Sequence, residues 1–313
     1  AAGARVTAAA VLAGDARWAT LVGDVRETLR GVPDGCAQTC VTSPPYFGLR
    51  DYGNAAQIGQ ETTPREFVDA LVAVMRDVRR VLADDGTLWL NIGDSYSQQG
   101  NGYKPKDLLG IPWRLAFALQ DDGWYLRSDI IWAKPNPMPE SVTDRPTRAH
   151  EYVFLLTKRA RYFYDADAIK EPSVMKPQNR LTARAEHPKG DTGRSMHLRP
   201  EGGTSYNSRN ARSVWNVPTD SFGGAHFATM PPELARRCIL AGSRRGDVVL
   251  DPFAGAGTTS LVAVGHGRRA IGCELNPEYA ALAVDRVAAV DTDATVPVRV
   301  EAPQWGALFG GAP

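Results

Sequence analysis

The sequence predicts an α/β protein whose core is a doubly wound, mostly parallel sheet. Signals for strands and helices alternate over most of the chain, which is typical of parallel strands joined by helical crossovers. One strand also runs straight into a glycine-rich loop that opens a helix, at residues 251–259. At 313 residues the chain is long enough for one large α/β domain with an inserted region.

The composition is that of an ordinary folded protein, with 43% hydrophobic and 23% charged residues. No apolar run approaches the roughly 20 residues that span a bilayer. The alanine-rich N-terminus lacks the basic start and long apolar core of a signal peptide. We therefore expect a cytoplasmic protein with no membrane partner. The four cysteines are too scattered, without histidines at ligand spacing, to predict a metal site.

The first clear strand ends at residues 40–42 and leads into a Ser-Pro-Pro-Tyr turn. The helix that follows has a well-marked start, because Thr63 can cap it, Pro64 takes its first position and Glu66 completes a capping box. Its apolar face continues to Leu82, and the Asp-Gly pair at 85–86 is expected to end it.

The later elements continue the alternation. In chain order we expect a strand at 87–92, a helix at 111–120, strands at 125–133 and 152–157, a helix at 232–241, a strand at 248–250, a helix from the glycine loop to 264, a strand at 270–273 and a helix at 278–289. The stretch from 170 to 215 shows no strong periodicity, and residues 291–313 are predicted to be a tail.

The glycine loop has the composition of a site for a nucleoside cofactor. Gly255 and Gly257 let the backbone approach a ligand with no Cβ in the way. Glu274 ends the next strand, about twenty residues on, where an acid can accept hydrogen bonds from both ribose hydroxyls. A dinucleotide fingerprint would have a third glycine in place of Ser260 and would not need Asp251, whose carboxylate suits the amino group of a methionine moiety. The pattern favours S-adenosylmethionine over NAD.

The Ser-Pro-Pro-Tyr turn suits transfer to an exocyclic amino group. Such a nitrogen is a poor nucleophile unless two acceptors hold its N–H groups and localise its lone pair, and the Ser43 hydroxyl and Pro44 carbonyl are two such acceptors. Pro44 and Pro45 make the turn rigid, and the Tyr46 ring offers a face on which a base can stack after leaving the duplex. An isolated turn of this kind is more often structural, but its position after a strand, together with the glycine loop, favours catalysis.

With the two motifs in this order, the chain resembles the β-class DNA amino-methyltransferases, in which the catalytic motif comes first and the cofactor motifs last. The resemblance covers roughly residues 20–285 and implies a Rossmann-like methyltransferase fold with an inserted target-recognition region. It divides the chain into a catalytic half at 20–168, a target-recognition region at 169–215, a cofactor-binding half at 216–290 and the tail. The catalytic residues are then Ser43, Pro44, Pro45 and Tyr46, and the residues that bind S-adenosylmethionine are Asp24, Phe227, Asp251, Phe253, Gly255, Gly257, Thr258, Thr259, Glu274 and Asn276.

A basic block lies where the resemblance implies target recognition. Residues 170–212 hold nine lysines and arginines against four acids. Taken alone this excess fits a solvated loop as well as a phosphate-contacting surface. In the context of the motifs, the predicted DNA contacts are Lys176, Arg180, Arg184, Lys189, Arg194, Arg199, Arg209 and Arg212.

The resemblance implies methyl transfer to the exocyclic N4 of cytosine in double-stranded DNA after base flipping. The first residue of the motif is Ser43 and not Asp or Asn, which resembles the cytosine-N4 subgroup. Adenine N6, the base of some serine-bearing relatives, is the alternative target, and a non-catalytic DNA-binding protein is a third interpretation. A cognate restriction endonuclease and a homodimer are partners that the resemblance leaves open. Met230 stands where many relatives carry lysine, which argues against a side-chain contact there.

Two polar or aromatic groups lie outside these motifs. Arg145, Arg148, His150 and Glu151 follow a loop, and we favour their pairing with one another at the surface over contact with DNA. The aromatic run at 162–164 is interpreted as core packing rather than as a stacking platform.

Overall fold

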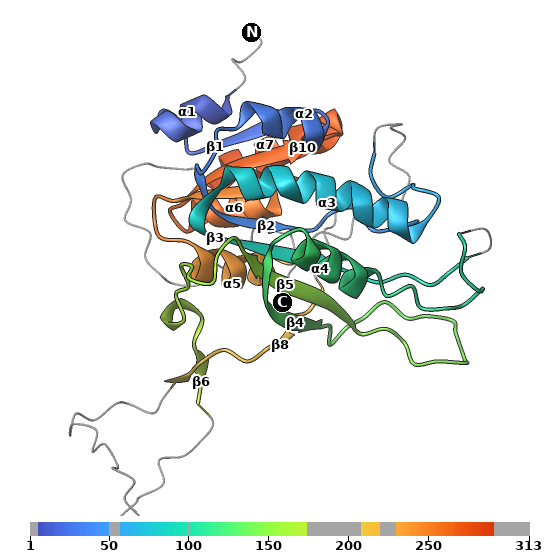
Figure 1. Ribbon diagram of the computed structural model, residues 1–313. Helices are drawn as coiled ribbons and strands as arrows, with labels where there is room; N and C mark the ends of the chain where they lie inside the picture. Colours follow the sequence, from blue (N-terminus) through green and yellow to red (C-terminus); the bar gives the residue numbers. More distant parts are fainter. Residues whose placement is uncertain (1–5, 50–56, 99–100, 174–207, 220–229, 291–313) are drawn as a thin grey trace, which may run out of the picture.

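An eight-stranded sheet forms the centre of the molecule in the computed structural model, which describes residues 6–49, 57–98, 101–173, 208–219 and 230–290 (Figure 1). The strand order is β1-β10-β9-β2-β3-β5-β4-β8. The strands are β1 (Trp18–Val22), β2 (Ala37–Thr42), β3 (Leu82–Ile92), β4 (Tyr125–Ala133), β5 (His150–Thr157), β8 (Val214–Asn216), β9 (Val248–Asp251) and β10 (Arg269–Glu274). A separate two-stranded ladder joins β6 (Glu171–Pro172) to β7 (Ser208–Arg209).

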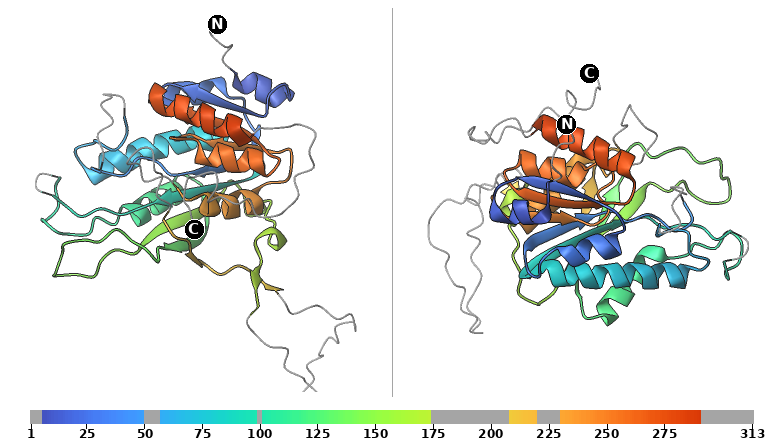
Figure 2. Two further views of the ribbon diagram at one scale, coloured as in Figure 1. Left: turned by 180° about the vertical axis from the view of Figure 1, so that it is seen from behind. Right: turned by 90° about the horizontal axis from the view of Figure 1, so that it is seen from above.

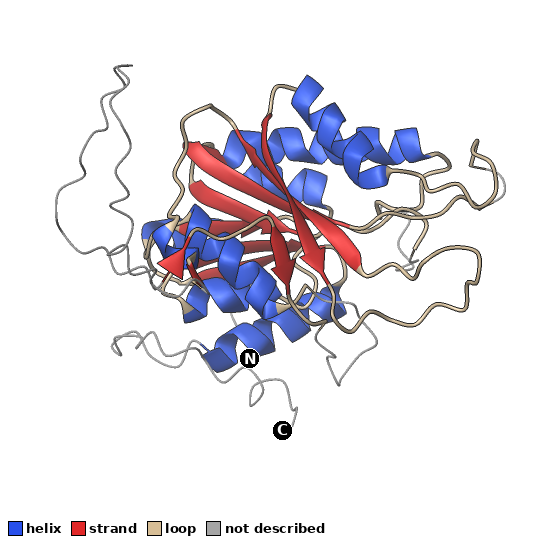
Figure 3. Cartoon of the chain, turned by 90° about the horizontal axis from the view of Figure 1, so that it is seen from below, coloured by secondary structure: helices blue, strands red, loops and turns tan. Residues whose placement is uncertain are grey.

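Helices cover both faces of the sheet (Figures 2 and 3). They are α1 (Ala8–Ala13), α2 (Val25–Thr28), α3 (Pro64–Val81), α4 (Ile111–Asp121), α5 (Pro232–Gly242), α6 (Thr258–Gly265) and α7 (Pro277–Val290), with 3₁₀ turns at Leu29–Gly31 and Asp167–Ile169. The apolar side chains of α3 and α4 join one core cluster, and those of α5 and α6 join another. Five strands, from β1 to β3 across the sheet, are parallel, and only β5 runs antiparallel to both of its neighbours. The predicted doubly wound, mostly parallel α/β fold is confirmed.

The start of α3 follows the predicted cap. Thr63 Oγ1 accepts a hydrogen bond from the Glu66 amide at 3.2 Å, and the Glu66 carboxylate accepts one from the Thr63 amide at 3.0 Å. These two bonds satisfy amide groups that have no partner within the helix. The prediction of this capping box is confirmed.

The end of α3 was predicted wrongly. The helix ends at Val81, and Leu82 already has extended backbone and lies opposite Ala37 of β2. Strand pairing therefore starts at a position where the apolar pattern predicts that the helix continues, and Leu82 is fully buried in the strand. Gly86 does not stop a helix; it lies at an irregularity of this ladder, where a Cβ would come within 3.0 Å of the carbonyl oxygens of Ala83 and Gln38.

Several short elements were not predicted. β1 and α1 lie within the N-terminal segment, and β8 lies in the stretch that shows no periodicity. Trp215 of β8 is 2% exposed and stacks on Trp89 of β3, with ring centroids 6.3 Å apart. Tyr162 packs against the same core cluster, which agrees with its interpretation as a packing residue. Tyr164 stacks on Trp89 but is 41% exposed, and the Arg244 guanidinium lies 3.8 Å above the centre of the Phe163 ring, so these two are not core residues. Among the helices of the described part of the chain, none has the length and apolar character needed to span a membrane.

The chain leaves β2 and β9 toward opposite faces of the sheet. These strands are parallel neighbours, with Thr39 opposite Val249 and Cys40 opposite Leu250. After β2 the chain continues to α3, and after β9 it enters α6, so the strands diverge at their carboxyl ends. In open α/β sheets, this is the place where ligands bind.

Candidate catalytic and cofactor site

Four neighbouring strands bring the predicted site residues to one edge of the sheet. β1, β10, β9 and β2 are parallel, so their carboxyl ends lie side by side. Asp24 follows β1, Glu274 ends β10, Asp251 ends β9 and Ser43 follows β2. The two motifs, which are far apart in the sequence, thus meet at the divergence of β2 and β9.

A buried hydrogen bond joins the two motifs directly. Thr42 Oγ1 donates to Asp251 Oδ1 at 2.7 Å, and the Phe253 amide donates to the same oxygen at 3.1 Å. The Asp251 side chain is 3% exposed, and burial raises the pKa of its carboxyl, while the donors oppose this shift. Thr259 Oγ1 also donates to the carbonyl of Val41 at 3.2 Å. Asp251 therefore fixes the catalytic turn to the glycine loop.

The two glycines of the loop have different roles. Gly257 has φ +78°, and a Cβ there would lie 2.7 Å from the Cβ of Ala283 on α7, so this glycine permits close packing of loop and helix. Gly255 has φ +51°, and a Cβ there would meet open space. Of the two, Gly255 is the position where a ligand could approach the backbone.

The Glu274 carboxylate lies beside this opening. Its Oε2 accepts a hydrogen bond from the Gly255 amide and its Oε1 one from the Asn276 amide, both at 2.8 Å. Burial raises the pKa of Glu274, and the two amides oppose that shift. Each carboxylate oxygen can accept more than one hydrogen bond, so the group retains acceptor capacity at the rim of the loop.

The other predicted cofactor residues are held by local structure. Asp24 caps α2 and binds the Arg26 guanidinium, whose hydrogen bonds lower the pKa of the Asp24 carboxyl. Thr258 is buried, Phe253 packs partly against the core, and Asn276 Oδ1 accepts from the Glu278 amide at the start of α7. Met230 also packs against the core, and Phe227 lies outside the described residues.

Hydrogen bonds of the Ser43 and Tyr46 side chains link the catalytic turn to Glu151. Pro44 is buried, and Ser43, Pro45 and Tyr46 are partly exposed. The Ser43 hydroxyl donates to the Tyr46 oxygen at 3.4 Å, and the Tyr46 hydroxyl donates to Glu151 Oε2 at 2.5 Å. The structure thus adds to the turn a carboxylate that the sequence motifs do not include.

The predicted surface pairing of Glu151 with its neighbours was therefore wrong. Glu151 forms an ion pair with Lys134, and both side chains are less than one-fifth exposed. Arg145 instead pairs with Glu140 at 2.7 Å, and its guanidinium lies 3.9 Å above the centre of the Tyr96 ring. The separation arises because residues 145–149 belong to a loop, whereas Glu151 lies on β5 beside β3.

A cleft of about 1150 Å³ opens next to the turn. It is lined by Phe47, which follows the turn, by Asp94 after β3, and by residues of the loop at 140–148. Lys106 and Asp144, which also line the cleft, form an ion pair at 2.7 Å. The lining of the cleft begins at Phe47, directly after the Ser-Pro-Pro-Tyr turn.

The basic block is only partly within the described structure. Lys176, Arg180, Arg184, Lys189, Arg194 and Arg199 lie outside the described residues. Arg209 and Arg212 both pair with Glu171, at 3.4 and 2.9 Å. This arrangement joins the two ends of the stretch that was predicted to recognise DNA.

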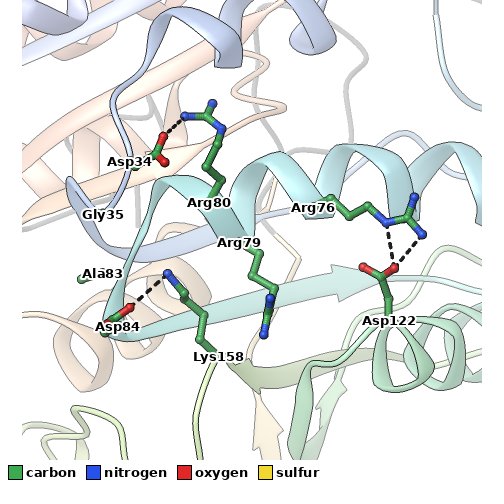
Figure 4. A pocket seen from close by; sticks show the side chains of 9 residues that line it. All are labelled: Asp34, Gly35, Arg76, Arg79, Arg80, Ala83, Asp84, Asp122 and Lys158. Carbon is green, nitrogen blue, oxygen red and sulfur yellow. Dashed lines mark hydrogen bonds and ion pairs between the residues drawn. The ribbon is translucent and has the colours of Figure 1, made fainter.

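A second pocket, of about 880 Å³, opens at the opposite edge of the sheet (Figure 4). Ion pairs there join Arg76 to Asp122, Arg80 to Asp34 and Lys158 to Asp84. The pocket lies at the start of β2, about 20 Å from the turn that follows the strand. Arg79 also lines the pocket and donates to the Gly123 carbonyl at 3.5 Å. Because three of the four cations are already in ion pairs, we assign the pocket no ligand. Within the described ranges, no cluster of three or more His, Cys, Asp or Glu side chains could hold a metal ion.

Comparison with known proteins identifies relatives of the whole arrangement. The family model described as DNA methylase matches residues 37–285. Type II methyltransferase M.XycI of Xanthomonas campestris pv. cyanopsidis is 50% identical over 287 residues, covering 85% of this chain and 86% of the relative. Type II methyltransferase M.SmaI of Serratia marcescens is 49% identical over 289 residues, covering 85% and 89%.

Solved structures agree with the fold. PvuII DNA methyltransferase (cytosine-N4-specific) superposes with a TM-score of 0.64 and 20% identity, over 95% of this chain and 94% of that one. A putative DNA modification methylase of Thermus thermophilus, solved in complex with S-adenosyl-L-methionine, has a TM-score of 0.59 and 29% identity, over 87% and 94%. The family model matches well over half of the sequence, and both curated relatives are matched along most of their length, so this chain belongs to the DNA methylase family.

Proposed function

We propose that this chain is a β-class, permuted DNA methyltransferase that transfers a methyl group from S-adenosylmethionine to N4 of cytosine in double-stranded DNA. The observation that carries the proposal is the contact between the two motifs. The Ser-Pro-Pro-Tyr turn and the glycine loop follow neighbouring strands, and Thr42 and Asp251 join them at 2.7 Å. A methyl donor in the loop and an amino group at the turn would then meet at one edge of the sheet.

The residues around the glycine loop fit the cofactor. The open Cβ position of Gly255 and the acceptor capacity of Glu274 suit an adenosine whose ribose hydroxyls need acceptors. When bound, S-adenosylmethionine supplies an activated methyl group on its sulfonium. Asp251 is enclosed by Thr42 and the Phe253 amide, so we assign it a positioning role in addition to the predicted contact with the methionine amino group.

The catalytic turn would act on the target base by accepting hydrogen bonds. The Ser43 hydroxyl oxygen and the Pro44 carbonyl hold the two N–H groups of the flipped base, which localises the lone pair of the amino nitrogen. The Tyr46 ring offers the stacking face. Its edge is packed closely, since a Cβ on Gly93 would lie 2.7 Å from Tyr46 Cε2. We therefore expect the positioning of the target base to supply much of the rate enhancement.

Ser43 is the residue that favours cytosine over adenine as the target base.

The curated relatives are named Type II methyltransferases, which supports a DNA substrate and a companion restriction endonuclease. We also propose that the basic stretch at 169–215 reads the target sequence and contacts the phosphates. A homodimer belongs to the same set of hypotheses.

The product nucleoside tests this proposal. Purified protein is incubated with unmethylated duplex DNA of broad sequence content and S-adenosylmethionine, and the DNA is digested to nucleosides for mass spectrometry. We expect N4-methylcytosine. N6-methyladenine would keep the mechanism but refute the assignment of the base to Ser43. If no methylated nucleoside forms, the proposed function is wrong.

A further inference from the structure

A chain of hydrogen bonds runs from Ser43 into the protein and ends at a buried ion pair. Ser43 Oγ lies 3.4 Å from the Tyr46 hydroxyl oxygen, and that oxygen lies 2.5 Å from Glu151 Oε2. The second carboxylate oxygen of Glu151 binds the Lys134 ammonium. The exposed fractions of the Glu151 and Lys134 side chains are 14% and 18%. None of the motifs in the sequence contains this carboxylate.

The Tyr46 hydroxyl faces two acceptors, Glu151 Oε2 at 2.5 Å and Asn91 Oδ1 at 3.4 Å. An ionised carboxylate accepts hydrogen bonds and cannot donate, so the single proton of Tyr46 points to the nearer acceptor, Glu151. The Tyr46 oxygen then accepts from the Ser43 hydroxyl at 3.4 Å. Asn91 cannot reverse this direction, because its amide nitrogen donates to Glu151 Oε2 and to the Tyr152 carbonyl, both at 3.1 Å.

The titration behaviour of Tyr46 agrees with this direction. Burial raises its pKa well above the usual value of 10, and the Glu151 charge adds to the effect. Tyr46 therefore keeps its proton throughout the working range of the enzyme. With the Ser43 proton committed to the Tyr46 oxygen, the lone pairs of Ser43 remain available to the solvent side of the turn.

We propose that Glu151 is a positioning residue that fixes the direction of the chain, so that Ser43 meets the amino group of the target base as a hydrogen-bond acceptor. Lys134 and Asn91 hold the carboxylate in place for this role. The inference rests on the proposed function, because it assumes that Ser43 holds an exocyclic amino group. It assigns a role to the Glu151 carboxylate, a charged group that contacts a turn whose own residues are neutral.

The substitution Glu151→Gln keeps the shape of the side chain and removes its charge. Because the Lys134 ammonium needs an acceptor, the glutamine oxygen stays with Lys134 and the amide nitrogen faces Tyr46, with the Asn91 amide turned to present its oxygen. The Tyr46 oxygen then accepts from glutamine and donates to Ser43, so the Ser43 proton points toward the amino group of the base. We expect kcat to fall about tenfold to hundredfold, the range for loss of a hydrogen bond to a charged group. The KM for DNA and the Kd for S-adenosylmethionine should change less than threefold, on the order of the scatter in such measurements.

Asp122→Asn is the matched control. The Asp122 side chain is also 14% exposed and also forms an ion pair, with Arg76, but it lies at the opposite edge of the sheet. It loses a paired, partly buried carboxylate in the same way. We expect it to retain the wild-type kcat, which would separate the loss of an ion pair from the loss of direction at Ser43.

A double-mutant cycle with Tyr46→Phe tests the path. Phenylalanine keeps the stacking ring but removes the oxygen through which Glu151 acts on Ser43. If the inference holds, Tyr46→Phe lowers kcat by a similar factor, and adding Glu151→Gln to it lowers kcat by less than about twofold further. Multiplied losses would show that Glu151 acts by another path and would overturn the inference.

The remaining outcomes are also decisive. An unchanged kcat in Glu151→Gln refutes the inference while the wild-type enzyme still methylates DNA, so the proposed function survives. If Glu151→Gln does not fold, Tyr46→Phe alone decides, since an unchanged kcat in that variant removes the oxygen from the mechanism. Absence of methylation by the wild-type protein would instead refute the proposed function.

Discussion

At the scale of single residues, Ser43 carries the clearest prediction. Its hydroxyl is a proposed acceptor for the target amino group, and within the described structure it bonds to the Tyr46 oxygen at 3.4 Å. Ser43→Ala should lower kcat about 10²-fold or more, the effect of removing one group that stabilises a transition state. The Kd for S-adenosylmethionine, measured by calorimetry, should stay within about twofold of the wild-type Kd. A twofold change corresponds to less free energy than one hydrogen bond contributes, so it would mean that no hydrogen bond to the cofactor is lost. A parallel loss of cofactor binding would contradict the separation of the two motifs.

The two loop glycines give a second prediction, in which stability and binding separate. Gly257→Ala introduces a Cβ 2.7 Å from that of Ala283 at φ +78°, so the free energy of unfolding should fall by about 2–4 kcal/mol. Gly255→Ala adds its Cβ to open space, and only the left-handed backbone costs about 1–2 kcal/mol. Denaturant titrations measure both effects. Equal losses in the two variants would refute the different roles.

Cofactor binding should follow the opposite order. Because the open side of Gly255 is the proposed ligand side, Gly255→Ala should weaken S-adenosylmethionine binding more than Gly257→Ala, once the folded fraction is taken into account. Calorimetric titration of the two folded variants decides between the positions. A weaker effect at Gly255 would move the proposed cofactor away from this part of the loop.

Residues whose partners are close in sequence could be predicted, and those with distant partners could not. The turn at Ser43 and the loop at 251–259 are contiguous motifs, each directly after a strand. Glu151 reaches the turn only because β5 pairs antiparallel with β3, where Asn91 lies opposite Val153. No local pattern reveals that register. A polar Asn91 at the end of an apolar strand was the one signal in the sequence that could have been followed.

At the scale of elements, the same distinction explains the boundaries of α3. Its start depends on Thr63 and Glu66, three residues apart, and could be predicted from the sequence. Its end depends on the pairing of Leu82 with Ala37, a residue that precedes the whole helix in the sequence. An apolar residue at position 82 fits both the apolar face of a helix and a buried strand, so periodicity alone extends the helix too far.

The end of α6 provides a pH-dependent prediction. His266 is the C-cap residue, and burial lowers its pKa to about 4, with the charges of Arg236 and Arg268 adding to the shift. Among the described residues its buried Nε2 has no hydrogen-bond partner. The folded-state pKa lies below the usual value near 6.5, so the contribution of His266 to stability is complete above pH 6.5. It is lost as the pH falls toward 4, because the unfolded chain binds the proton first.

His266→Gln should therefore flatten the acid side of the stability profile. The shift corresponds to roughly 3 kcal/mol. Partial exposure of the ring reduces this to about 1–2 kcal/mol. Denaturant titrations at pH 7, 5.5 and 4 measure the free energy of unfolding of the wild type and of the variant. The wild type should lose about 1–2 kcal/mol more than the variant between pH 7 and pH 4. Parallel profiles would show that another group causes the acid sensitivity.

At the scale of the whole molecule, one sheet contains both parts of the site. β2 comes from the segment assigned to catalysis and β9 from the segment assigned to cofactor binding, and they are hydrogen-bonded neighbours. β1, near the start of the chain, pairs with β10, near the end of the described residues. The functional segments along the sequence are therefore not separate folding units. Sequence motifs could locate the active edge, but the strand order that brings its parts together is a property of the complete fold.

Strands β6 and β7 belong to a separate two-stranded ladder and not to the main sheet. The chain passes Glu171–Pro172 and returns at Ser208–Arg209, and these two strands form an antiparallel ladder, with Glu171 opposite Arg209 (Figure 1). Arg212 also binds Glu171 at 2.9 Å. The points where the chain leaves and returns are thus already adjacent. A short glycine-serine link can join them without disturbing the sheet.

Replacing residues 174–207 by such a link tests where the DNA sequence is read. That segment carries six of the eight basic side chains assigned to DNA contact, including Lys176 and Arg199. We expect the variant to bind S-adenosylmethionine with wild-type affinity, because every strand that forms the cofactor edge is retained. Site-specific methylation should be lost, and DNA affinity should depend less steeply on salt, since fewer phosphate contacts release fewer counterions. Methylation of the wild-type sequence at the wild-type rate would place target recognition elsewhere, and loss of cofactor binding would show that the segment supports the fold.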